Sequence, residues 1–163
     1  MVPVEPPDRF VTPAAREKLD GVFGFSPDAF MQDWEIEQSD GRRLMEFIDA
    51  YDTLVLDDDE RFALMGLIVA SSHDALDFYG LTNSQWRLVH DRLVADASLH
   101  ASTIYYWCCV DATCDDECFT LTPRMRLVWN AAFGSREPIP ETPGIGEPDR
   151  DRGRIAADPS HTT

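Results

Sequence analysis

Positive charge is scarce in this sequence of 163 residues, which has 14 Lys and Arg residues against 30 Asp and Glu residues. The formal net charge at pH 7 is therefore −16. Nucleic acid phosphates repel such a negative chain, so direct binding to DNA or RNA is not expected. A macromolecular partner that uses charge is expected to be a basic protein.

Long hydrophobic runs are also missing. The longest, Phe62 to Ala70, covers about half of the roughly 20 residues that a membrane-spanning helix requires. The first residues, Met1 to Asp8, have neither the basic start nor the apolar stretch of a secretory signal. We therefore expect no membrane association, a cytoplasmic location and reduced cysteines.

Metal-binding spacings are absent from the cysteine-rich segment. Its four cysteines contain no C-x₂-C pair of the kind that zinc knuckles use: Cys108, Cys109, Cys114 and Cys118. The first two follow Tyr-Tyr-Trp and are interpreted as small buried hydrophobic residues. We predict no metal and no cofactor, while a structural zinc and redox activity of these cysteines stay open as alternatives.

Catalytic motifs are absent as well. His73, His90 and His100 are scattered, and no H-E-x-x-H pattern occurs. The run from Asp57 to Glu60 lacks the alternating carboxylates and glycine of a calcium loop, and helix capping explains it. We predict no catalytic residues and a protein that is not an enzyme; a site assembled from scattered residues is the alternative.

Acidic residues are what the sequence has in excess, and they are concentrated. From Asp28 to Glu60 there are twelve acidic residues against only Arg42 and Arg43. A second cluster comprises Asp111, Asp115, Asp116 and Glu117. Like charges this close together repel one another and cost stability, so a basic partner would explain them. General solubility is the alternative explanation.

Proline marks both ends of the chain. Residues 1–11 contain three prolines and are predicted to form a flexible N-terminal arm. Residues 134–163 contain five prolines and too few large aliphatic side chains to offset their ordering entropy, which predicts a disordered C-terminal tail. The folded domain is expected to span 12–133.

Helical signals follow one another through the first half of this domain. Thr12-Pro13 predicts a helix start, with an end near Gly21, and Ser26-Pro27-Asp28 predicts another start ahead of residues 29–34. An amphipathic stripe comprises Leu44, Phe47, Ile48, Tyr51 and Leu54 or Val55. Residues 62–70 are apolar on every side, which predicts a central helix.

The second half of the domain continues the pattern. Asn83 or Ser84 is expected to cap a helix that buries Trp86, Val89 and Leu93. Residues 99–110 favour a helix, with a strand as the alternative, and Thr122-Pro123 predicts a last helix that ends at Gly134. The sequence therefore predicts an all-α, single-domain bundle of five to seven helices.

The segment from Phe30 to Glu37 combines aromatic and acidic residues. Phe30, Trp34 and Ile36 fit either core positions or a partly exposed anchor within a negative rim, as binding hot spots often show. If a basic partner binds, the residues expected to contact it are Asp33, Trp34, Glu35, Glu37, Asp57, Asp58, Asp59 and Glu60.

Several stretches resemble a group of small acidic helical bacterial proteins. They include residues 31–37, 46–51, 59–65 and 68–71, then Tyr106-Trp107 and the segment Phe119-x-Leu121-Thr122-Pro123-x-x-Arg126, so that the resemblance covers about 25–130. The group is immunity-protein-like, which implies an immunity or antitoxin-type inhibitor of a basic protein such as a nuclease toxin. The alternatives are a nucleic-acid mimic that inhibits a DNA-binding protein and a helical scaffold or regulatory subunit; the oligomeric state stays open.

Overall fold

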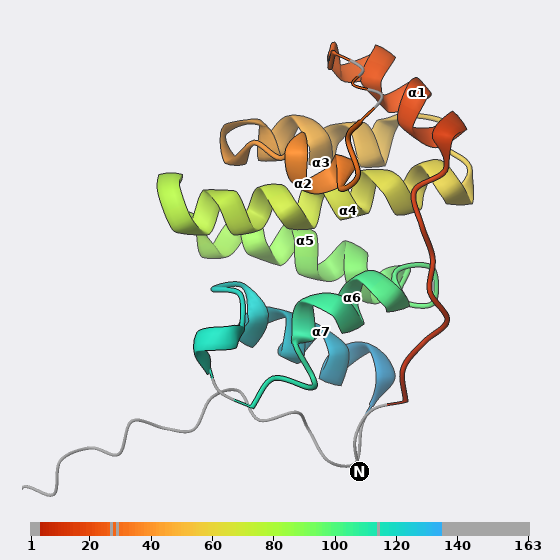
Figure 1. Cartoon of the computed structure of the whole chain (residues 1–163). Coiled ribbons are helices and arrows are strands. Elements are labelled where there is room, and N and C mark those ends of the chain that lie inside the picture. The colour runs from red at the N-terminus through yellow and green to blue at the C-terminus, as the bar shows by residue number, and fades with distance from the viewer. Residues whose placement is uncertain (1–3, 27, 29, 114, 135–163) are drawn as a thin grey trace, which may run out of the picture.

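Seven α-helices and no strand make up the computed structural model of the chain, which describes residues 4–26, 28, 30–113 and 115–134 (Figure 1). The predicted all-α, single-domain bundle is confirmed. The predicted C-terminal tail lies, apart from Gly134, outside the described residues.

Helix α4 (Asp58–Asp74) lies at the centre of the bundle, as its apolar sequence predicted. Every residue from Phe62 to Ser72 is buried. The helix starts with a capping box, in which Asp57 accepts from the Glu60 backbone N–H and the Glu60 carboxylate accepts from the Asp57 N–H. Helices α1, α2 and α3 pack against α4 on one side and α5 on the other (Figure 1).

The helices above α4 mostly follow their sequence signals. Helix α1 (Pro13–Phe23) is capped by Thr12 as predicted, but it continues past Gly21 and ends at Gly24, whose φ is 70°. Helix α3 (Leu44–Thr53) follows the short 3₁₀ turn η1 (Gly41–Arg43) and buries the predicted stripe, except that Val55 is exposed.

Helix α2 (Trp34–Glu37) is much shorter and later than predicted, because residues 30–33 are not helical. The Arg16 guanidinium donates to the backbone carbonyls of Asp28 and Met31, and the Asp28 carboxylate accepts from the Phe30 N–H. These side chains satisfy backbone groups that a helix would otherwise pair, so this segment holds a loop. Pro27 and Ala29 lie outside the described residues.

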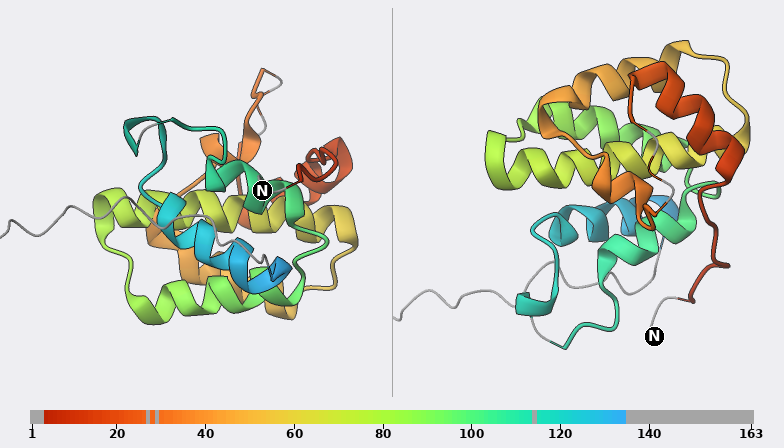
Figure 2. Two further views of the ribbon diagram at one scale, coloured as in Figure 1. Left: turned by 90° about the horizontal axis from the view of Figure 1, so that it is seen from below. Right: turned by 45° about the horizontal axis from the view of Figure 1, so that its top comes forward.

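Helices α5 (Asn83–Ala95), α6 (Ala101–Cys108) and α7 (Thr122–Phe133) form the other half of the bundle, and α7 packs against both α5 and α6 (Figure 2). Thr82, and neither Asn83 nor Ser84, caps α5. The strand alternative for residues 99–110 is wrong, and α7 ends at Gly134 as predicted. The π-helical turn η2 (Ala75–Tyr79) extends α4, and η3 (Asp115–Glu117) lies between α6 and α7.

Residues 4–11 form no helix and run from α1 towards α6 (Figure 1). This segment was predicted to be a flexible arm, but its second half is attached to the domain. The Arg9 guanidinium donates to the Asp59 carboxylate at 2.8 Å and lies over the Phe62 ring, and Val11 packs against the core. The second half of the N-terminal segment therefore has a fixed place on the folded domain.

Candidate functional site

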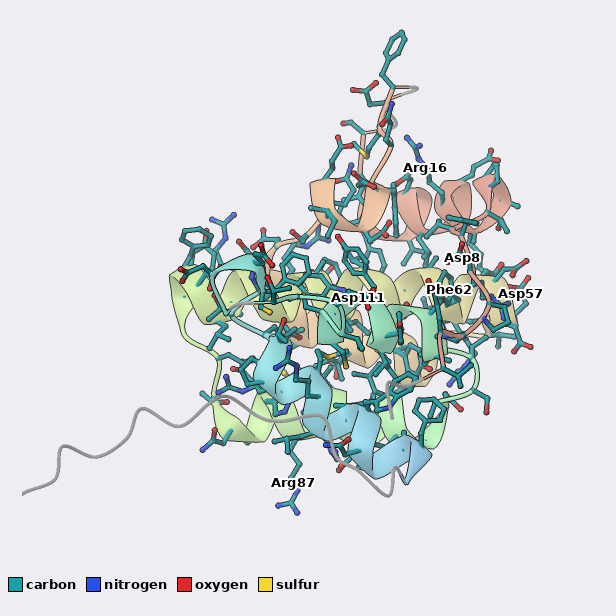
Figure 3. All side chains as sticks on the ribbon, turned by 60° about the horizontal axis from the view of Figure 1, so that its bottom comes forward. Asp8, Arg16, Asp57, Phe62, Arg87 and Asp111 are labelled. Atoms are coloured by element: carbon teal, nitrogen blue, oxygen red, sulfur yellow. The ribbon has the colours of Figure 1, made fainter. Side chains whose placement is uncertain are left out.

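A large open groove separates α1 and the loop before α2 from helix α6. Its volume is about 1160 Å³, and its lining comes from the N-terminal segment, α1, α2, α4, α6 and Phe119. Asp8 and Phe62, both of which line it, lie between α1 and α6, whereas Arg87 extends from the opposite side of the molecule (Figure 3). We call this surface the acidic groove.

The floor of the acidic groove is apolar. Phe62 and Gly66 of α4 contribute to it, together with Trp34 of α2 and Trp107 of α6. The aliphatic stem of Glu35 lies in ordinary contact over Gly66, since a Cβ added there would be 3.6 Å from the Glu35 Cβ. The short helix α2 therefore rests directly on the central helix and carries its carboxylates above the floor.

The buried side chain of Trp34 attaches α2 to α1. This side chain is only 2% exposed, and its Nε1–H donates to the Asp20 carboxylate at 2.7 Å. Arg16 approaches the other oxygen of Asp20 at 3.7 Å. The core alternative for Trp34 is thus confirmed, and the prediction that Trp34 is an exposed contact residue is corrected: its role in any binding is to hold neighbouring carboxylates in place.

The rim of the acidic groove carries an excess of negative charge. Within the part of the chain that the structure describes, five lining carboxylates have no cationic partner: Asp8, Glu17, Asp28, Asp33 and Glu35. The groove also contains Arg9 and Arg16, but these are engaged with Asp59 and Asp20. The described residues therefore leave the negative charge of the rim uncompensated.

Tyr106 of α6 faces these carboxylates from the other wall. Its side chain is 58% exposed and lines the groove. Partial burial raises the pKa of its hydroxyl above the usual value of 10, and the nearby charges of Asp33 and Glu35 raise the pKa further. The negative charges of Asp33 and Glu35 therefore act on a residue of α6, on the opposite wall of the groove.

The acidic quartet at residues 57–60 lies elsewhere. It is the N-terminal end of α4, and none of its members lines the groove. Asp57 and Glu60 form the capping box, Glu60 also pairs with Lys18 at 2.7 Å, and Asp59 pairs with Arg9 at 2.8 Å. Among the described residues, only Asp58 of the quartet has neither an ion pair nor a capping hydrogen bond, so most of the quartet is used within the fold.

The structure thus brings three of the eight predicted contact residues together at the groove: Asp33 and Glu35 on its rim and the buried Trp34 in its floor. Glu37 is exposed on α2 outside the groove lining, and its carboxylate accepts from the Gln32 N–H. Sequence reasoning did not identify Asp8, Glu17 or Tyr106. No local signal connects them to α2, because they come from the N-terminal segment, α1 and α6.

A second polar cluster connects four segments of the bundle and is partly buried. Tyr51 of α3 donates its hydroxyl hydrogen to Asp96 at 2.7 Å and lies 2.8 Å from the His100 Nε2, while Arg61 donates to Asp96 at 2.6 Å. Burial lowers the pKa of His100 to about 4 and raises the pKa of Tyr51. His100 and Tyr51 are buried, whereas Arg61 and Asp96 are partly exposed, and the cluster joins four segments of the bundle.

The tautomer of His100 follows from the same hydrogen bonds. Since the Tyr51 hydroxyl donates to Asp96, it accepts from a protonated Nε2, and His100 Nδ1 then carries the lone pair. That nitrogen is buried and has no hydrogen-bond partner among the described residues. The ring stacks on Phe62, whose centroid is 6.5 Å away. Phe62 therefore separates this polar cluster from the acidic groove.

The cysteines have structural surroundings. Cys108 is fully buried, as predicted, and burial raises the pKa of its thiol to about 12, while its carbonyl accepts from Arg126. Cys109 ends α6 and is half-buried. Cys114 lies outside the described residues, within which no group of three or more His, Cys, Asp or Glu side chains is arranged to hold a metal.

Within the described residues, no helix combines the length and apolar character needed to cross a membrane. Comparison with known proteins gives no match for this chain among protein-family models, curated proteins or solved structures.

Proposed function

We propose that this protein is a non-enzymatic binding protein that takes up a cationic region of a protein partner at the acidic groove. The observation that supports this most is the rim of five carboxylates without a cationic partner in the described chain, set around an apolar floor. Such a rim repels itself in the free protein, and a cationic partner removes this cost.

The kind of partner follows from the charge. A basic protein that binds nucleic acid does so with Lys and Arg side chains. If those side chains enter the acidic groove, they are no longer available to phosphates, and the partner is inhibited by competition. An immunity or antitoxin-type inhibitor of a basic protein such as a nuclease toxin fits this description. We propose that it acts in the cytoplasm, without binding nucleic acid or membranes itself.

The proposal is tested by capture followed by kinetics. The full chain is immobilised, exposed to extract of the source cells at low salt, and the retained proteins are identified. The association rate of the main retained protein is then measured at increasing salt. We expect a basic protein whose association rate falls about tenfold or more as salt screens the charges. A rate that does not change with salt would reject the proposal.

The same experiment separates the alternatives. A nucleic-acid mimic would retain several unrelated DNA-binding proteins that duplex DNA displaces, whereas an inhibitor of one toxin would retain a single basic protein. A scaffold or regulatory subunit would retain partners regardless of their charge. The pairing of Asp59 and Glu60 with Arg9 and Lys18 speaks against the mimic, because it interrupts the rows of free carboxylates that would imitate phosphates.

A further inference from the structure

We infer that the acidic groove binds an amphipathic helix of the partner, with its apolar face on the groove floor and an arginine stacked on Tyr106 between Asp33 and Glu35. This inference rests on the proposed function and specifies the chemistry of the partner.

The size of the groove favours a peptide segment over a small molecule. Its volume of about 1160 Å³ exceeds the roughly 300–1000 Å³ that is usual for small-molecule pockets. Exposed apolar side chains occur along it: Phe10 is 76% exposed and Ile36 is 43% exposed. Apolar groups left in water on two sides of a long groove suit an elongated ligand that carries apolar side chains of its own.

The secondary structure favours a helix among peptide ligands. An extended peptide gains affinity by pairing its backbone with an exposed strand edge, and the described residues contain no strand. Helices and ordered loops line the groove, so recognition has to rely on side chains. An amphipathic helix whose apolar residues recur every three or four positions meets this requirement.

The charge of the groove requires cations beside the apolar face. Asp28, Asp33 and Glu35 lie on the α2 side, and Asp8 and Glu17 lie on the N-terminal segment and α1. None of the five has a cationic partner among the described residues, so a helix with basic residues beside its apolar stripe complements these carboxylates.

Arginine suits Tyr106 better than lysine does. An exposed aromatic ring beside carboxylates can stack a planar guanidinium while the carboxylates accept its N–H groups. The protein already contains this arrangement: the Arg61 guanidinium lies 4.3 Å from the centroid of the Tyr51 ring and donates to Asp96 at 2.6 Å. Tyr106 with Asp33 and Glu35 offers the same groups, and no arginine of the described residues lies over the Tyr106 ring.

The test uses a synthetic peptide of about 18 residues that forms an amphipathic helix, with leucines along one face and arginines on both flanks. A peptide of the same composition in scrambled order keeps the charge but has no apolar face. A third peptide replaces every arginine by lysine. Affinities for the full chain are measured by calorimetry. We expect the helical peptide to bind about tenfold more tightly than the scrambled peptide, since only the former can bury apolar surface.

Protein variants locate the binding site. Asp33→Asn combined with Glu35→Gln is expected to weaken the helical peptide about tenfold, because charge-assisted hydrogen bonds are lost. The matched control, Asp49→Asn combined with Asp58→Asn, removes the same charge at two exposed sites outside the groove and is expected to change affinity less than about twofold. Tyr106→Leu is expected to abolish the preference for arginine over lysine.

Two results would overturn the inference. One is equal affinity for the helical and scrambled peptides. The other is an equal loss in the groove variant and its control, which would mean that charge acts without a defined site. Circular dichroism of each variant shows whether it folds, and all four substituted carboxylates are on side chains without ion pairs in the described chain. If salt-dependent capture of a basic protein persists while the peptide test fails, the proposed function stands and this inference alone falls.

Discussion

Cys109 is the described non-glycine residue with a positive φ, 46°, and it ends helix α6 in the left-handed conformation. A side chain there is strained by about 1 kcal/mol or more, and glycine removes the strain. The thiol contributes only long contacts, to the Tyr106 carbonyl at 3.9 Å and the Thr122 hydroxyl at 3.5 Å. We expect Cys109→Gly to raise the free energy of unfolding by about 0.5–1 kcal/mol in urea titrations. A loss of stability would show that the thiol contacts outweigh the strain.

His100 makes stability depend on pH. Its folded-state pKa of about 4 lies below the ordinary value of 6.5, because burial disfavours the charged ring. The unfolded chain therefore binds more protons between these values, so this contribution is complete above pH 6.5 and is lost as pH falls towards 4. We expect a loss of roughly 3 kcal/mol across this window, measured by urea titration at pH 7 and pH 4.5.

A glutamine in place of His100 cannot titrate, so His100→Gln is expected to flatten this pH dependence even though it lowers stability at pH 7. His90→Gln, at a less buried histidine on α5, is the control and should keep the wild-type slope. Asp96 affects stability at lower pH than His100 does. Arg61 lowers the pKa of Asp96, so the contribution of Asp96 to stability is lost only as pH falls below the ordinary value of 3.8. An unchanged slope in His100→Gln would assign the effect to other groups.

At the scale of elements, Gly41 fixes how the turn η1 meets the end of α4. A Cβ at this position would lie 2.5 Å from the backbone nitrogen of Ala75, and the Gly41 N–H donates to Asp74 at 2.6 Å. Gly41→Ala is therefore expected to cost about 2–3 kcal/mol in thermal or urea unfolding, since backbone must move. Gly21→Ala is the matched control: it lies in α1 with open space around it and is expected to add about 0.5–1 kcal/mol. Equal changes in the free energy of unfolding for the two variants would show that Gly41 is not closely packed.

The helices that were predicted well from the sequence are those whose start and end signals lie close to the helix in the chain. Thr12 before Pro13, the carboxylates before α4 and Gly134 after α7 each act within one turn of the chain. The prediction failed before α2, where Arg16 supplies hydrogen bonds from a different helix. The groove escaped sequence reasoning for the same reason, because its walls meet only once α1, α2 and α6 have packed around α4.

At the scale of the whole molecule, 30 acidic residues outnumber 14 Lys and Arg residues, so internal ion pairs leave a surplus of negative charge and the net charge is −16. Exposed pairs contribute about 0–1 kcal/mol each, whereas the surplus of like charge repels over the whole surface. We therefore expect the unfolding temperature at pH 7 to rise when potassium chloride is increased, since salt screens the repulsion. A fall would mean that the internal pairs contribute more than the repulsion costs.

The central claim is that a cationic helix enters the acidic groove and not the quartet at the start of α4. Backbone amide chemical shifts of the labelled full chain, recorded by NMR during titration with the amphipathic arginine peptide, test it most directly. We expect the largest shifts at Asp33, Glu35 and Tyr106, with little change at residues 57–60. Shifts centred on residues 57–60, or spread evenly over the surface, would contradict it.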